Sequence, residues 1–171
     1  MSERLPEFID PLQLAVERRL LTGVLLLSRM RRLAPLLANT QGTVSIDLEF
    51  GQDGQNIKYL LGRISSNLEL VCQRCLQPIN FSINTQPCLG IVTSQAQAER
   101  LPANYEPLLV AAGRIPLATI IEDELLLNLP DIPKHEDENC LDLDKFTKPE
   151  PIAEAPRKNP FALLNQLKQK K

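Results

Sequence analysis

A stretch of alternating apolar and polar residues is the feature that most restricts what this chain can fold into. Residues 43–50 (TVSIDLEF) put an apolar side chain at every second position, and strand-like residues return in 57–64 (IKYLLGRI), 67–72 (NLELVC) and 79–85 (INFSINT). Because successive side chains of a strand point to opposite faces of a sheet, a period of two predicts strands with one buried face. Short turns join the four runs, one of them at Asp53-Gly54, so the sequence predicts an antiparallel meander with one face in water.

Two helices are predicted before this meander. Asp10 followed by Pro11 is typical of an N-cap with proline at the first helical position, and Gly23 suits the end of that helix. A second helix is predicted to start at Ser28, and Pro35 makes it short or kinked.

After the meander, the sequence predicts one more strand around 107–111 and then a packing helix. The apolar residues of this helix repeat at helical spacing before Pro130, and they are Leu117, Ile120, Ile121 and Leu125. The predicted fold class is α+β, with N-terminal helices, about four to six antiparallel strands, a packing helix and a basic C-terminal helix or tail. We expect one domain at 1–133, an acidic to proline-rich linker at 134–158 and a basic amphipathic helix at 159–171.

Composition limits the compartment and the class of partner. The start of the chain, MSERLPEFIDP, lacks the basic beginning and apolar core of a secretory signal. The most apolar run, LLTGVLLLS, is much shorter than the roughly 20 residues that span a bilayer. We therefore expect a cytoplasmic protein with no membrane partner, where reducing conditions disfavour structural disulfides. Aromatic residues make up 4% of the chain, which disfavours an RNA platform of stacked aromatic side chains.

The cysteines offer one candidate metal site. Cys72 and Cys75 are three positions apart at a strand end, a spacing at which two thiolates can bind one ion at tetrahedral angles. A structural zinc needs two more ligands, and the sole histidine, His135, stands five residues before Cys140. Cys88 is the substitute ligand. The sequence thus predicts a structural zinc as the one conceivable cofactor.

Two alternatives to a metal site stay open for the Cys-x-x-Cys pair. A metal-free pair of thiols at the edge of the core has equal weight, because the second half of the metal site lies 60 residues away, from 75 to 135. Thioredoxin-like redox chemistry is the less favoured alternative, because that motif begins a helix, whereas Cys75 leads into a predicted strand.

The motifs of common catalytic sites are absent from the sequence. No glycine-rich phosphate loop, nucleophile elbow or His-Glu-x-x-His pattern occurs, and histidine-dependent catalysis would have to use His135. Glu122, Asp123 and Glu124 are adjacent on the predicted packing helix, where we expect them to be solvated acids on its polar face. The sequence therefore predicts a non-catalytic protein with no small-molecule substrate.

Charge is distributed unevenly along the chain. Residues 122–144 are rich in acids, whereas 157–171 carry lysine and arginine and no acid, which predicts an acidic face and a basic tail. A solvated surface with a soluble terminus accounts for the same pattern equally well. Arg29, Arg31 and Arg32 form a second basic cluster. The tail residues expected to bind RNA or a partner protein are Arg157, Lys158, Phe161, Leu164, Leu167, Lys168, Lys170 and Lys171.

These motifs, in this order, resemble those of the bacterial YceD family, the large ribosomal RNA subunit accumulation proteins. The resemblance is carried by CQRC, the lone Cys88, LPANYEP, IEDELLLNLPDIPKH, Cys140 and the closing NPFALLNQLKQKK, and it covers essentially the whole chain. It implies a role in the synthesis, processing or stability of 23S ribosomal RNA and so in assembly of the large subunit. It supplies no mechanism and no catalytic residues.

Two mechanisms fit such a role. In the first, the basic tail and the arginine cluster bind ribosomal RNA through its phosphates. In the second, the protein is an adaptor that holds a ribosomal protein or an assembly enzyme, with the acidic face against a basic partner and the apolar side of the tail in a groove. The net charge of −2 and the few aromatic residues favour the adaptor slightly. A ribonuclease is the least favoured alternative.

Overall fold

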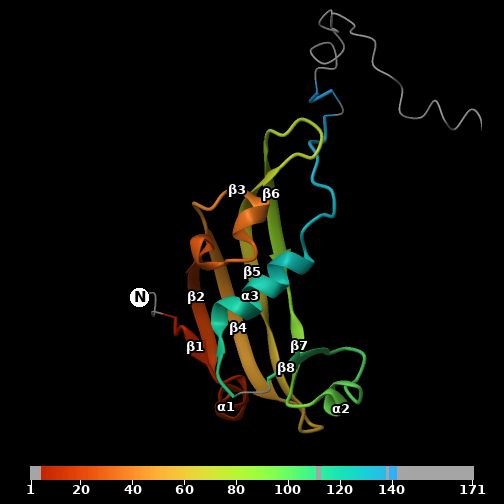
Figure 1. The fold of residues 1–171 in the computed structure, drawn as a ribbon. Coiled ribbons are helices and arrows are strands. Elements are labelled where there is room, and N and C mark those ends of the chain that lie inside the picture. Colours follow the sequence, from red (N-terminus) through yellow and green to blue (C-terminus); the bar gives the residue numbers. More distant parts are fainter. Residues whose placement is uncertain (1–4, 111–112, 138, 142–171) are drawn as a thin grey trace, which may run out of the picture. The chain divides into compact units, whose positions relative to one another are not determined.

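The computed structural model describes residues 5–110, 113–137 and 139–141 (Figure 1). The chain divides into two compact units, Met1–Asp137 and Glu138–Lys171, and each is described by itself. The elements, all in the first unit, are β1 (Phe8–Ile9), α1 (Pro11–Glu17), β2 (Leu20–Leu26), the 3-10 helices η1 (Leu27–Arg29) and η2 (Ala34–Leu36), β3 (Leu37–Asn39), β4 (Thr43–Gln52), β5 (Lys58–Val71), β6 (Pro78–Thr85), β7 (Cys88–Val92), α2 (Gln95–Ala98), β8 (Glu106–Leu109), β9 (Ile115–Pro116) and α3 (Leu117–Leu127).

A seven-stranded sheet organises the described residues, and β5 is its centre. The strand order is β2-β4-β5-β7-β8, and β3 and β6 also pair with β5. β4 and β3 lie along one edge of β5, while β7 and β6 lie along the other. The predicted meander is confirmed in part: β4, β5 and β6 follow one another as antiparallel neighbours, but they are three strands and not four. The α+β class is confirmed as well.

Two predicted strands are one strand in the structure. The runs 57–64 and 67–72 are joined through Ser65 and Ser66 into β5, which pairs on both sides at this point. The Ser66 hydroxyl donates to the backbone oxygen of Thr43, at 3.0 Å, which lets a polar side chain sit on the buried face. A serine pair that breaks the apolar pattern therefore does not break the strand.

One face of the sheet carries the core. Val44, Ile46, Leu48 and Phe50 of β4 are at most 2% exposed, while the residues between them are exposed. The apolar residues predicted for the packing helix lie in the same hydrophobic cluster, so α3 covers this face, where Figure 1 shows it crossing β4 and β5. The alternation in the sequence has thus sorted core from solvent as expected.

The N-terminal region holds one α-helix instead of two. Asp10 caps α1 as predicted, and its Oδ1 accepts the backbone N–H groups of Leu12 and Gln13, each at 3.1 Å. The helix ends earlier than expected, at Glu17, because Arg18 takes a left-handed conformation with φ 50°. Gly23 does not end the helix, as it lies within β2, opposite Ile46.

The second predicted helix, from Ser28, is replaced by two 3-10 helices and β3. Pro35 lies in the first turn of η2 and supplies no backbone N–H for a longer helix. The backbone N–H groups of Arg32 and Leu33 bind the side chain of Glu122 instead of helical carbonyls. A contact with a residue 90 positions away therefore keeps this segment from forming one continuous α-helix.

The strand predicted around 107–111 is present as β8, with an unexpected direction. It pairs in parallel with β7, the one parallel pair among the described strands. The connection between them contains α2 and Tyr105, whose hydroxyl donates to Asp53 Oδ2 at 3.1 Å. This bond ties the connection to the predicted Asp53-Gly54 turn between β4 and β5.

Candidate functional site

The Cys-x-x-Cys pair lies in a tight hairpin loop between β5 and β6. The Cys72 N–H donates to the backbone oxygen of Gln77 and the Leu76 N–H donates to that of Cys72, both at 2.9 Å. Leu76 has a left-handed backbone, with φ 60°, which reverses the chain before Pro78 begins β6. The predicted strand-turn-strand setting is therefore present, and it differs from the helix start that a thioredoxin-like motif needs.

Three predicted ligands of the first unit converge at this loop. The sulfur atoms of Cys72 and Cys75 and a ring nitrogen of His135 lie within 4.8 Å of one another. Cys75 Sγ is 3.3 Å from His135 Nδ1. Ligand atoms on a tetrahedral zinc with Zn–S of about 2.3 Å and Zn–N of about 2.0 Å stand roughly 3.5 to 3.8 Å apart. The separation of Cys75 and His135 is close to this value, and the soft donor set fits a zinc ion.

The second ring nitrogen of His135 has the partner that a metal-binding histidine usually has. Nε2 lies 3.2 Å from the backbone oxygen of Pro78, and a carbonyl oxygen can only accept, so the proton belongs on Nε2. Nδ1 then presents its lone pair to the two sulfurs. Metal-ligating histidines fix their tautomer with such a bond to a carbonyl.

Hydrogen bonds to backbone oxygen atoms attach the histidine-bearing segment to the cysteine loop. The Gln73 N–H donates to the backbone oxygen of Pro133, at 2.8 Å. Arg74 Nη2 donates to the backbone oxygen of His135, at 3.1 Å, and also to that of Asp137. Sequence reasoning missed Arg74, whose place between the two cysteines was the available signal. The first residues of the predicted linker are thus fixed on the hairpin.

The environment of Cys72 favours its thiolate. Burial by itself raises the pKa of this thiol, since its side chain is 0% exposed. Hydrogen bonds from the backbone N–H groups of Cys75, Arg74 and His135 and from the Cys75 side chain outweigh burial and lower the pKa of Cys72 to about 5. Thiolates bind metals and thiols do not, so the loop is prepared for a cation.

The two other cysteines have different places. Cys88 begins β7 opposite Leu61, outside the group formed at the loop. Cys140 belongs to the second unit, and its role as the fourth ligand stays a prediction. The eight tail residues of 157–171 lie outside the described residues, so their role also stays a prediction.

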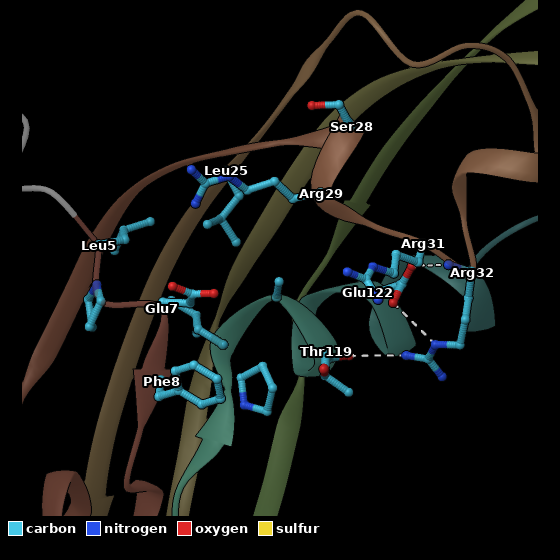
Figure 2. Close-up of a pocket in the computed structure, with 14 residues that line it drawn as sticks. Leu5, Glu7, Phe8, Leu25, Ser28, Arg29, Arg31, Arg32, Thr119 and Glu122 are labelled. Atoms are coloured by element: carbon cyan, nitrogen blue, oxygen red, sulfur yellow. Dashed lines mark hydrogen bonds and ion pairs between the residues drawn. The ribbon is translucent and has the colours of Figure 1, made fainter.

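The expectation that the three acids of α3 are solvated is wrong for two of them, which are buried. Glu122 is 6% and Glu124 is 7% exposed. Glu122 Oε1 accepts the backbone N–H of Leu33 at 2.9 Å. The same oxygen accepts the backbone N–H of Arg32 at 2.6 Å, and Oε2 accepts Arg32 Nε at 3.1 Å (Figure 2). Glu122 therefore belongs to a structural hydrogen-bond network and not to an acidic surface.

An apolar stripe lies on the face of β2 and β4 that points away from the core. Leu20, Val24 and Leu26 of β2 are 67%, 52% and 50% exposed. Asp47 and Glu49 of β4 stand beside them in the register, and both are exposed. β2 ends the strand order of the sheet, so its outer edge has no strand partner among the described residues. We call these five residues the β2–β4 outer face.

Comparisons with known proteins identify relatives of the chain. The model of the protein family described as large ribosomal RNA subunit accumulation protein YceD matches residues 60–168. A Haemophilus influenzae protein with that description is 34% identical over 172 residues, which cover 98% of each chain. No solved structure matches. Within the described residues, no helix combines the length and the apolar character that crossing a membrane requires.

Proposed function

Since the chain belongs to the YceD family of large ribosomal RNA subunit accumulation proteins, we propose that it supports accumulation of this RNA as a non-catalytic adaptor. In this proposal it acts in the cytoplasm, has no small-molecule substrate and holds a basic ribosomal protein or assembly enzyme of the large subunit. The level of ribosomal RNA then changes as a consequence of a protein contact.

The observation that carries the adaptor role is the β2–β4 outer face. An exposed edge strand with large apolar side chains invites pairing with another chain, and proteins usually protect such edges. Here Leu20, Val24 and Leu26 are exposed on an edge whose backbone is unpaired among the described strands. An extended segment of a partner can add as one more strand, with main-chain hydrogen bonds for affinity.

The charges beside this stripe select the kind of partner. Glu49 stands opposite Leu20 and Asp47 opposite Thr22, whose hydroxyl donates to Asp47 Oδ1 at 2.9 Å. Carboxylates that border an apolar stripe favour a segment in which apolar residues alternate with lysine or arginine. The occupant we propose is therefore an extended segment of a basic protein.

The cysteine loop has an architectural role in this proposal. Cys72, Cys75 and His135 hold a zinc ion in this proposal, and Cys140 stays the fourth ligand predicted from the sequence. The ion joins the β5–β6 hairpin to the chain that follows α3, which are 60 residues apart in sequence. Structural zinc sites are closed by four protein ligands and contribute to folding without taking part in chemistry.

A pull-down from cells tests the adaptor role. The full chain is compared with a Leu20→Thr/Val24→Thr/Leu26→Thr variant, which keeps strand-forming side chains but removes most of the apolar stripe. Asn84→Thr, an exposed residue of β6, is the matched control. We expect one basic large-subunit or assembly protein to survive RNase treatment with the full chain and the control, and to be lost with the triple variant. Retention of that protein by the triple variant contradicts the proposed face.

Direct RNA contact through the tail is the second candidate, supported by the run of basic residues without any acid in 157–171. The same experiment with residues 157–171 removed separates it from the adaptor role. Recovery of ribosomal RNA that depends on the tail and vanishes with RNase, with no protein left behind, replaces the adaptor by an RNA-binding factor. Cleavage of precursor RNA by the purified chain would overturn the non-catalytic assignment.

A further inference from the structure

A cavity of about 820 Å³ lies among the start of α3, β1 and the loop that follows β2 (Figure 2). We propose that this cavity binds a nucleoside phosphate, with the phosphate between Arg29 and Arg31 and the base against Phe8. The nucleotide is either free or an unpaired residue of an RNA strand, and the two sources share this chemistry. The inference goes beyond the adaptor role and does not depend on it.

The size and lining of the cavity suit a small ligand. Ligand sites occupy roughly 300 to 1,000 Å³ and combine apolar walls with a few polar groups. Leu5, Leu25 and Pro116 supply apolar wall, while Arg29 and Arg31 supply charge at the rim. The residues come from segments far apart in the sequence, so the cavity exists only in the folded chain.

Two of the three arginines at the cavity are available to an anion. Arg32 is engaged by Glu122 and by Asp123, whose Oδ1 is 2.6 Å from Arg32 Nη1. Arg29 and Arg31 are exposed and have no hydrogen bond or ion pair within the described residues. Figure 2 shows both reaching over the space above the first turn of α3. Because Arg32 fixes the loop through Glu122, the two neighbouring arginines are held at the cavity.

The first turn of α3 adds to the positive potential. The N-cap position is Pro116, and no side chain caps the helix. The Leu117 N–H donates to the backbone oxygen of Glu7, at 3.0 Å, but the following N–H groups of Ala118 and Thr119 have no such cap. Uncapped N–H groups at a helix start attract phosphate. Here they support the arginines and are not a site by themselves.

Glu7 and Phe8 distinguish a nucleotide from a simple anion. Glu7 lines the cavity on the β1 side and repels a second negative charge there. Its carboxylate can accept N–H groups, which a nucleobase offers on its edge and inorganic phosphate does not. Phe8 is 55% exposed and presents a ring on which a base can stack. A ligand with an anionic end matches the arginine side of the cavity, and a planar end with N–H donors matches the side formed by Glu7 and Phe8.

Binding is tested on the full chain with inorganic phosphate, the four nucleoside 5′-monophosphates and an unstructured single-stranded RNA hexamer. The readouts are calorimetry and the amide NMR shifts of Ala118 and Thr119. We expect a nucleotide or the hexamer to bind at least tenfold more tightly than inorganic phosphate and to shift both amides. Equal affinity for the monophosphate and the hexamer identifies a free nucleotide, and tighter binding of the hexamer identifies RNA.

The variants separate the parts of the site. Arg29→Gln/Arg31→Gln is expected to weaken nucleotide binding at least tenfold, while Arg63→Gln, an exposed arginine of β5, leaves it unchanged. Phe8→Leu weakens nucleotide but not phosphate binding, and Glu7→Gln strengthens phosphate binding alone. The proposal is overturned if neither amide moves with any nucleotide or RNA, or if the double arginine variant binds as the full chain does. The adaptor role is judged separately, by the protein recovered in the pull-down.

Discussion

Replacing Glu122 by alanine is expected to release the loop between β2 and β3 from α3. Glu122 is 6% exposed, and its carboxylate makes three hydrogen bonds, two with the backbone N–H groups of Arg32 and Leu33 and one with the Arg32 side chain. Leaving the N–H groups of Arg32 and Leu33 without their acceptor costs about 2 to 4 kcal/mol, while the half-exposed Arg32 guanidinium regains water and adds little. A loss of this size leaves a domain of ordinary stability folded but much weaker.

Glu122→Gln gives a graded test of the same argument. Both backbone N–H groups bind Oε1, so the amide oxygen of glutamine can replace it, while the amide NH₂ then faces the N–H of Arg32 Nε. We expect a loss of about 1 to 2 kcal/mol. Asp123→Asn removes the exposed ion pair of the same arginine and is expected to cost less than about 1 kcal/mol.

Urea unfolding of the three variants measures these differences, with the m-value as a check that the unfolded surface is unchanged. Hydrogen exchange at the amides of Arg32 and Leu33 gives a local readout, and it should accelerate strongly in Glu122→Ala and little in Glu122→Gln. If Glu122→Ala costs no more than Asp123→Asn, or if both amides stay protected in it, the carboxylate does not hold this loop.

Three further predictions concern other parts of the molecule. The purified chain should bind one zinc ion, measured by native mass spectrometry, and Cys88→Ser should retain it. Chelation of the metal or Cys72→Ser should lower the melting temperature. A Cys72→Ser variant with full thermal stability contradicts the structural role. Burial, and then the charges of its acidic neighbours, raises the pKa of Glu124. The contribution of its protonated form to folding stability is therefore fully present below the unfolded pKa and is lost as pH rises through the folded pKa. Glu124→Gln should therefore raise the free energy of unfolding, measured in urea against the unchanged chain, more at pH 7 than at pH 4. An equal effect at both pH values contradicts this. A methyl group on Gly62 would meet the backbone oxygen of Asp47, so Gly62→Ala should cost about 1 to 3 kcal/mol in the same assay, while Gly54→Ala, with open space around it, should cost much less.

Local patterns in the sequence were sufficient where neighbours along the chain decide the structure. Asp10 and Pro11 start α1, the alternation of β4 separates core from solvent, and Asp53-Gly54 turns the chain into β5. In each case the deciding interaction spans a few residues, such as a cap, a side-chain period or a turn. The candidate ligands could also be named from the sequence, because cysteine and histidine are few and their chemistry is specific.

Contacts between distant segments decided the rest. The predicted second helix gave way because Glu122 accepts the N–H groups of Arg32 and Leu33, and no pattern within 28–37 contains that partner. The same contact turned a predicted surface acid inward. The parallel pairing of β7 and β8 likewise depends on the path of the connection between them.

The cysteine loop shows most clearly which features follow from the sequence and which depend on the tertiary structure. By itself, the sequence determined that Cys72 and Cys75 can share one ion and that His135 is the sole histidine able to join them. Only the tertiary structure decided that His135 reaches them and that Pro78 orients its ring, since these contacts cross about 60 residues. The Gln73 backbone N–H and the Arg74 guanidinium support that approach, because their bonds to Pro133 and His135 hold the chain beyond α3 on the hairpin.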